Sequence, residues 1–347
     1  MPLSQSHSGP AVKLPDAEDP LALELNENPF SPLPTVRAAM VRAVASANRY
    51  PEFLPQRFRR LIGEHLGVAD EQIIVGAGAT GVIMQVLQVL THPGDRIVTA
   101  TPTFDGYPIF AQIARLQPVT VPLTERGYHD LDAMADAATG ARVVVVCRPH
   151  NPTGTVEAAH DLERFLRRVA GSTVVLLDEA YVEFVAPRYR IDTDALLRRF
   201  PNIVVVRTFS KAYGLAGMRT GYGICSPDMA RTLWSMQLPF GATLTGLAAV
   251  AASFDAQAQL RHRIRLITAE RDYLRLRLRD KGIWSADAHA NFVYIPAGGQ
   301  LWTEAFGGAG PRVRTYPDGS VRITVGTRQS TQAVLAAIAS ALTPPAP

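Results

Sequence analysis

The sequence predicts an α/β protein, a three-layer sandwich around a mostly parallel sheet, with a smaller α+β domain after it. In the middle of the chain, short runs rich in Val and Ile alternate with helical stretches, as in a parallel sheet covered on both faces. After about residue 245 the pattern changes to a long helical region rich in Arg, followed by short strands. A length of 347 residues and a hydrophobic content of 47% fit about two domains with a large core.

The expected elements follow the apolar runs in chain order. The first part carries strands at Gln72–Val75, Arg96–Ala100, Val143–Cys147, Thr173–Leu177 and Ile203–Arg207, with helices such as Thr80–Leu90 and Ala158–Val169 between them. The second part carries one helix over Ala251–Lys281, strands at Asn291–Pro296 and Val321–Val325, and a last helix at Ser330–Leu342.

These elements suggest four segments. We expect a flexible N-terminal arm at 1–20, where Ser and Pro are frequent, and an N-terminal segment at 21–45 that joins the small domain. The large domain then spans 46–242, and the small C-terminal domain spans 243–347.

Composition excludes several functional classes. The 35 basic and 31 acidic residues leave a net charge of +4, too small a surplus for an electrostatic nucleic-acid binder. No apolar run is long enough to span a membrane, and the first residues lack the apolar core of a secretion signal. Cys147 and Cys225 both lie in apolar runs that look like buried strands, which indicates reduced core thiols in a cytoplasmic protein, and we expect no metal site.

Gly76-Ala-Gly-Ala-Thr-Gly81 has the G-x-G-x-x-G spacing between a predicted strand and a predicted helix. Glycines at that place let a backbone approach a phosphate at the helix N-terminus, so a dinucleotide-dependent oxidoreductase is one hypothesis. The next strand, however, ends in Ala100, Thr101 and Pro102, without the acid that would bind a ribose hydroxyl. The turn therefore predicts a phosphate bound at a helix N-terminus, and dinucleotide binding is the weaker alternative.

Three further segments, Asn151-Pro-Thr-Gly, Asp178-Glu-Ala-Tyr181 and Thr208-Phe-Ser-Lys211, follow predicted strands, and Arg219 comes eight residues after the lysine. In an open α/β sheet such positions meet at one edge, where ligands bind. A lysine can bond an aldehyde, a carboxylate can keep a ring nitrogen protonated, and Arg with hydroxyls can hold a phosphate. Together these groups describe a site for pyridoxal 5′-phosphate.

Each residue alone has a simpler explanation: a solvated lysine, a helix-capping aspartate, a Pro-Gly turn, or an arginine in a surface ion pair. The order and spacing of these segments together nevertheless favour the cofactor site over these separate explanations. With VVVCRPHNPTG, VLLDEAYVEF, VRTFSKAYGLAGMRTGY and VRITVGT, the chain resembles the fold type I pyridoxal-phosphate aminotransferases, in the histidinol-phosphate aminotransferase branch. The likeness covers about residues 23–342 and is greatest to actinobacterial members known as aromatic or phenylalanine aminotransferases.

The resemblance implies a role for each matching residue. Lys211 would hold the cofactor as an aldimine and shuttle the proton, while Asp178 would pair with the ring nitrogen. The remaining cofactor contacts would be Tyr181 and Asn151 at the phenolic oxygen, Phe104 stacked on the ring, and Ala79, Thr80, Thr208, Ser210 and Arg219 at the phosphate.

The resemblance also implies partners and substrates. Tyr50 would reach the cofactor of a second subunit, which implies a homodimer, although a packing tyrosine before a proline is the alternative. Arg322 would bind the substrate anion, and Arg314 would be a second anion contact or a solvated edge-strand charge. The segment Asn26–Asn28 would belong to the substrate pocket.

The implied activity is a ping-pong transamination between glutamate, or another amino donor, and either imidazole-acetol phosphate or an aromatic 2-oxo acid. A decarboxylase, a lyase or a specialised-metabolite aminotransferase on the same scaffold stays open. The first phosphate-binding turn lacks the usual acid, and Arg148 and His150 replace the residues usual before NPTG. We expect these changes near the cofactor rim, where they would affect substrate choice.

Overall fold

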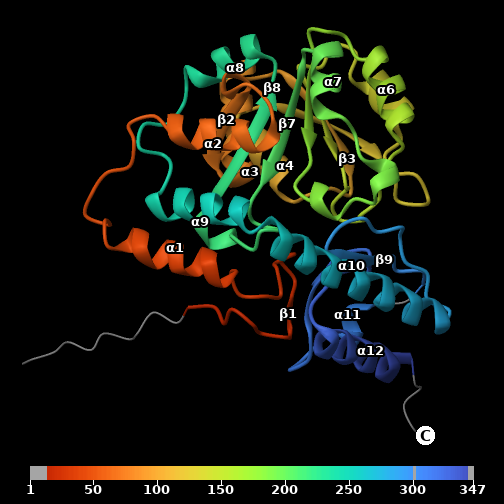
Figure 1. The fold of residues 1–347 in the computed structure, drawn as a ribbon. Helices are drawn as coiled ribbons and strands as arrows, with labels where there is room; N and C mark the ends of the chain where they lie inside the picture. The colour runs from red at the N-terminus through yellow and green to blue at the C-terminus, as the bar shows by residue number, and fades with distance from the viewer. Residues whose placement is uncertain (1–13, 300–301, 343–347) are drawn as a thin grey trace, which may run out of the picture.

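The protein is described here by a computed structural model of residues 14–299 and 302–342 (Figure 1). Its larger part contains a seven-stranded sheet in the order β2-β8-β7-β6-β5-β3-β4. The strands are β2 (Ile73–Ala77), β3 (Arg96–Thr101), β4 (Gln117–Pro122), β5 (Val143–Cys147), β6 (Val174–Asp178), β7 (Ile203–Thr208) and β8 (Thr220–Cys225). Only the two pairs that involve β8 are antiparallel in this sheet, so the predicted, mostly parallel sheet is confirmed.

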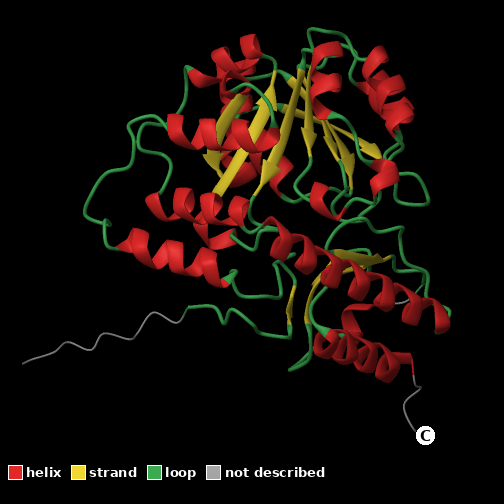
Figure 2. Cartoon of the chain, viewed as in Figure 1, coloured by secondary structure: helices red, strands yellow, loops and turns green. Residues whose placement is uncertain are grey.

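Helices cover both faces of this sheet (Figure 2). Apolar side chains of α2, α5, α6, α7 and α9 form one core with the sheet, and those of α3, α4 and α8 form the other. β5 is buried at all five positions because helices lie on both of its faces. The helices are α2 (Gln56–Leu66), α3 (Gly78–Leu90), α4 (Gly106–Ile113), α5 (Leu131–Ala137), α6 (Ala159–Arg168), α7 (Thr193–Arg199), α8 (Pro227–Trp234) and α9 (Leu244–Asp255).

The smaller part contains a four-stranded sheet in the order β1-β10-β11-β9, below the large sheet in Figure 1. β1, from the N-terminal segment, pairs in parallel with β10, which comes from the C-terminal part of the chain. A separate apolar core joins this sheet to α10 and α12. The elements are β1 (Ala22–Leu23), β9 (Phe292–Ile295), β10 (Arg312–Thr315), β11 (Val321–Thr324), α10 (Gln257–Asp280), α11 (Trp302–Ala305) and α12 (Arg328–Leu342).

The predicted single helix over Ala251–Lys281 is wrong. The chain forms two helices, α9 and α10, with Ala256 between them at φ −99° and ψ 27°. α9 packs on the large-sheet core and on α1 (Pro34–Val44), whereas α10 packs on the small-sheet core. The break therefore lets the chain pass from one core to the other, which residue propensities do not reveal.

Several other expectations can be placed. β1 and β4 were not expected as strands, whereas the run that ends at Cys225 was expected to be a buried strand and forms β8. The limits of the four segments stay a prediction. The N-terminal arm lies mostly outside the described residues. Cys147 and Cys225 are buried free thiols, while the cytoplasmic location inferred from them stays a prediction. Among the described helices, none combines the length and apolarity needed to cross a bilayer.

Candidate active site

A cavity of about 350 Å³ opens where the carboxyl ends of the parallel strands face the small sheet. Residues far apart in sequence meet there because each follows a different strand or belongs to the small sheet. Twelve of the fourteen predicted site residues line it: Ala79, Thr80, Phe104, Asn151, Asp178, Tyr181, Thr208, Ser210, Lys211, Arg219, Arg314 and Arg322.

Lys211 lies on the loop after β7, with its Nζ 2.9 Å from the carbonyl oxygen of Leu25 and 5.8 Å from the centre of the Tyr181 ring. Burial lowers the pKa of Lys211 to about 8, and the positive charge of Arg322 adds to this effect. About a tenth of the amine is therefore in the neutral, nucleophilic form at pH 7, far more than for a lysine of ordinary pKa.

Asp178, the last residue of β6, is 4% exposed. Its Oδ2 accepts a hydrogen bond of 2.7 Å from the Tyr107 hydroxyl, and its Oδ1 accepts one of 3.0 Å from the Ala180 amide. Burial raises the pKa of Asp178, and these two donors oppose the rise. The strand and α4 thus fix a buried carboxyl group with both oxygens oriented.

A hydrogen-bonded network on one part of the cavity lining connects Tyr181, Asn151 and Arg322. The Tyr181 hydroxyl accepts hydrogen bonds from the amides of Asn26 (3.0 Å) and Asn151 (3.5 Å). Arg322 donates from Nη1 to Asn151 Oδ1 (2.6 Å) and from Nη2 to the carbonyl of Glu24 (2.6 Å). Its Nε is buried and has no partner among the described residues. A guanidinium with an unused buried donor is suited to an anionic ligand.

Another part of the cavity lining, at the start of α3, has the features of a phosphate site. α3 begins at Gly78, whose φ is +75°, and a Cβ there would lie 2.6 Å from Nη2 of Arg219. Gly221 of β8 passes so close to the start of α3 that a Cβ would contact the Ala79 nitrogen at 2.5 Å. Thr208 and Ser210 present hydroxyls beside this turn, 2.9 Å apart. Helix amides, a cation and hydroxyls together favour a dianion.

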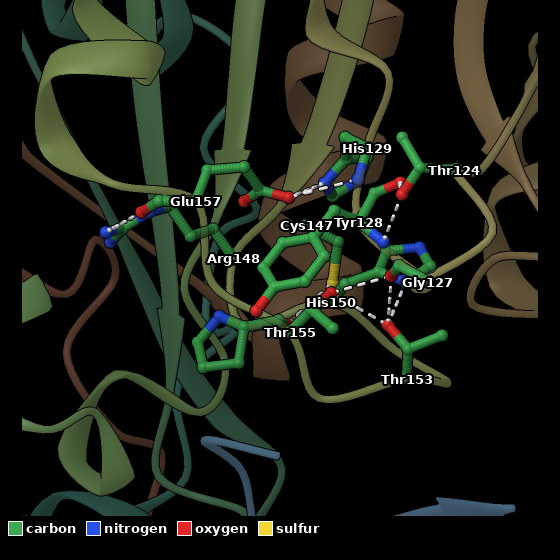
Figure 3. A network of polar contacts seen from close by, with 11 residues as sticks. Thr124, Gly127, Tyr128, His129, Cys147, Arg148, His150, Thr153, Thr155 and Glu157 are labelled. Carbon is green, nitrogen blue, oxygen red and sulfur yellow. Dashed lines mark hydrogen bonds and ion pairs between the residues drawn. The ribbon is translucent and has the colours of Figure 1, made fainter. Parts of the chain in front are cut away.

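Behind the Asn151 turn lies a buried polar network (Figure 3). His129 Nδ1 is 2.8 Å from Glu157 Oε1, and His150 Nδ1 is 3.0 Å from Thr153 Oγ1. Burial acts to raise the pKa of Glu157, but the charge of His129 and its hydrogen bond outweigh it and lower the pKa. Arg148 donates to the main-chain carbonyls of Glu157 and Tyr189. This network holds the 151–154 turn in place.

The expectation that Arg148 and His150 lie near the cofactor rim is therefore wrong. Both are buried, at 1% and 0% exposure, and neither lines the cavity. Their side chains hold the loop from behind instead of facing a ligand.

The other two predicted site residues lie outside the cavity lining. Asn28 donates from its amide to the carbonyls of Lys211 and Ala212, so it fixes the lysine loop from outside. Tyr50 is 82% exposed, and its ring centre lies 4.7 Å from that of Phe240. One cavity contact was missed by the sequence analysis, that of the Tyr107 hydroxyl with Asp178. Asn26, from the predicted Asn26–Asn28 segment, lines the cavity and donates to the Tyr181 hydroxyl. Tyr107 lies three residues after Phe104, a helical spacing that gives no sign of its partner.

The model of the family described as aminotransferase class I and II matches residues 18–338. The chain belongs to this family. The predicted enzyme class, a pyridoxal-phosphate-dependent aminotransferase of fold type I, is thereby confirmed, and the oxidoreductase alternative is set aside. An aromatic amino acid aminotransferase of Streptomyces avermitilis is 40% identical over 319 residues, which cover 90% of this chain and 89% of that protein.

Solved structures share the fold of this aminotransferase. The histidinol-phosphate aminotransferase of Sinorhizobium meliloti, in complex with pyridoxal 5′-phosphate, has a TM-score of 0.85 at 24% identity, with 98% of each chain covered. The L-threonine-O-3-phosphate decarboxylase of Porphyromonas gingivalis has a TM-score of 0.78 at 20% identity, with 92% of this chain and 98% of that chain covered. At these identities the likeness shows the fold alone.

Proposed function

We propose that this aminotransferase binds pyridoxal phosphate in the cavity and moves an amino group from glutamate, or another donor, to an aromatic 2-oxo acid. The observation that carries the proposal is Arg322, a buried guanidinium whose Nε is unpartnered in the same cavity as Lys211. The aromatic side of the proposal is supported by the relative from Streptomyces avermitilis, whose name states that substrate class.

The residues present fit the cofactor. The turn at Ala79–Thr80 with Arg219, Thr208 and Ser210 would hold the phosphate, because it offers free helix amides, a cation and hydroxyls. Phe104 lines the cavity and would pack on the ring, Asp178 would hold the ring nitrogen, and Tyr181 with Asn151 would hold the phenolic oxygen. Lys211 would bind the aldehyde carbon.

When bound, the cofactor supplies an electron-accepting ring that stabilises negative charge at the substrate Cα. Lys211 Nζ is the base that would take the Cα proton and return it on the cofactor side. Asp178, as a carboxylate, would keep a proton on the ring nitrogen, and the Tyr107 hydrogen bond favours that ionised form. Arg322 would orient the substrate by its carboxylate, in place of the hydrogen bond it now donates to Asn151.

Two other substrates follow from specific observations. Arg314 lines the cavity beside Arg322, and two arginines would suit the phosphate of histidinol phosphate. The fold shared with a threonine-phosphate decarboxylase keeps carbon dioxide release as an alternative outcome.

The proposal is tested on the dialysed protein by its visible spectrum after separate additions of phenylalanine, tyrosine, histidinol phosphate, threonine phosphate and glutamate. Conversion of the bound cofactor to its amine form by phenylalanine or tyrosine, and its recovery with an aromatic 2-oxo acid, is the expected result. A response to histidinol phosphate alone would contradict the aromatic assignment. Release of carbon dioxide from threonine phosphate would replace transamination by decarboxylation.

The pKa of Lys211 predicts how cofactor capture depends on pH. Because only the neutral amine attacks an aldehyde, the rate at which the cofactor-free protein binds pyridoxal phosphate covalently should rise about tenfold per pH unit up to pH 8 and then level off. Stopped-flow absorbance measures this rate. Arg322→Met should move the plateau to higher pH, because the positive charge of Arg322 contributes to the lowered pKa. A rate that is flat between about pH 6 and 8 would contradict the assignment.

Homodimerisation through the Tyr50 surface is part of the proposal. Tyr50, Phe53, Met236, Leu238 and Phe240 are exposed large hydrophobic residues, at 43 to 82% of their surface. A cluster of this kind on a soluble chain marks an interaction site, and a second copy would place Tyr50 beside the neighbouring cofactor. Sedimentation equilibrium should give a dimer mass for the wild type and a monomer mass for Phe240→Asp. Val44→Asp, at another exposed hydrophobic residue, the last of α1, is the control and should keep the dimer mass.

A further inference from the structure

The small sheet places two arginines side by side in the active-site cavity. Arg314 of β10 is the register partner of Arg322 of β11, and both line the cavity. Residues directly opposite on antiparallel strands share one face of the sheet, so the two positive charges are neighbours. Like charges in this arrangement repel, and two adjacent guanidiniums suit a ligand with two negative charges, such as a phosphate monoester.

The two arginines differ in their partners. Arg322 donates only to neutral oxygens within the described part of the chain, those of Asn151 and Glu24, and keeps its Nε free. Arg314 instead lies 2.9 Å from Asp105, measured from Nη2 to Oδ2, and stacks over the ring of Tyr316. Arg314 is therefore neutralised, whereas Arg322 is available.

Asp105 reaches Arg314 from the other side of the cavity. It precedes α4, directly after Phe104, and so belongs to the large-sheet part of the molecule, whereas Arg314 belongs to the small sheet. Although Asp105 occupies the N-cap position of α4, its side chain caps no amide in the described helix. The ion pair is thus the interaction that the structure assigns to this carboxylate.

We propose that Asp105 is a specificity-determining residue that selects substrates carrying a single carboxylate and rejects those with a phosphate dianion. The inference rests on the proposed function and deepens it by naming the charge of the substrate. Asp105 occupies Arg314 and adds a negative charge at the cavity rim, so that one free arginine remains for the substrate anion. The site then binds a monoanionic aromatic acid, whereas histidinol phosphate would meet a neutralised second arginine.

Solvent limits the size of the effect. The side chains of Arg314 and Asp105 are 44% and 55% exposed, so the pair is partly screened. Asp105→Asn keeps the shape of the side chain, frees Arg314 and removes one negative charge. We expect the dissociation constant for a phosphate dianion to fall roughly tenfold, because one positive charge becomes free and one negative charge is removed beside the ligand.

The test uses the cofactor-loaded protein and two unreactive probes, phenyl phosphate and 3-phenylpropionate, which share a ring and differ in the charge of the head group. Calorimetry at about pH 8, where the phosphate monoester is a dianion, gives both dissociation constants. Asp105→Asn should tighten phenyl phosphate roughly tenfold and change 3-phenylpropionate less than about threefold. The double variant Asp105→Asn/Arg314→Gln should lose the gain, because Arg314 is its source.

Asp228→Asn is the matched control, since Asp228 also pairs with an arginine on the surface, at 3.0 Å, and lies on α8. It should change neither constant. An Asp105→Asn protein that loads cofactor but binds phenyl phosphate no more tightly overturns the inference, as does a gain that persists in the double variant. Should Asp105→Asn fold poorly, Asp105→Ala removes the same charge and repeats the test. A wild-type protein that never loads the cofactor contradicts the proposed function instead, so the two failures are distinguishable.

Discussion

Replacing Lys211 by Ala should abolish transamination and remove the visible absorbance of a lysine-bound cofactor. The side chain is placed to be both the attachment point and the base, so we expect kcat to fall by about 10⁴-fold or more, the upper range for a positioned acid–base group. Steady-state assay with phenylalanine and an absorbance spectrum of the dialysed protein measure both effects.

The small number of lysines allows the attachment site to be identified directly. The sequence contains three lysines, Lys13, Lys211 and Lys281. After borohydride reduction, a peptide digest should therefore carry the cofactor mass on Lys211 and on neither of the others. Lys281→Ala, at an exposed position after α10, is the matched control and should keep full activity. Cofactor mass on Lys281, or an active Lys211→Ala protein, would refute the assignment.

Replacing Asp178 by Asn should lower kcat roughly 10³-fold, the size of effect expected when one preorganised electrostatic group is removed. The amide keeps the size of the carboxyl group but cannot hold a proton on the ring nitrogen. The melting temperature should stay the same or rise, because burying a carboxylate costs free energy that the neutral amide avoids. Parallel kinetics and thermal unfolding measure the two effects.

This opposition between activity and stability separates a functional role from a structural one. Asp132→Asn, on the exposed side of α5, is the control, since its carboxylate pairs with Arg168 at the surface. It should leave kcat unchanged. An Asp178→Asn protein with more than about a tenth of the wild-type kcat would show that the ring nitrogen needs no carboxylate.

The strands of the large sheet, and the polar residues at their ends, could be predicted from the sequence. Runs such as Val143–Cys147 are apolar at every position, so their burial between two helical layers could be predicted. Asp178, Thr208 and Asn151 each end or follow such a run, which explains why their meeting in one cavity was predictable.

What the sequence did not reveal depends on contacts between distant segments. Gln117–Pro122, which forms β4, contains two prolines and so lacks the pattern of a strand. Arg148 and His150 look in the sequence like residues of a binding loop, but their side chains are buried behind that loop. The Tyr107 hydroxyl contacts Asp178, 71 residues away, and the Asp105 carboxylate contacts Arg314, some 209 residues away. Local sequence patterns do not reveal such distant partners.

The pairing of β1 with β10 has a consequence for how the enzyme is made on the ribosome. Ala22 must wait for Arg312, roughly 290 residues later, before its strand has a partner. All strands of the large sheet, which end at Cys225, emerge well before that moment. The segment that places Leu25 on Lys211 and Asn26 on Tyr181 can therefore pair with β10 only after every strand of the large sheet has been synthesised.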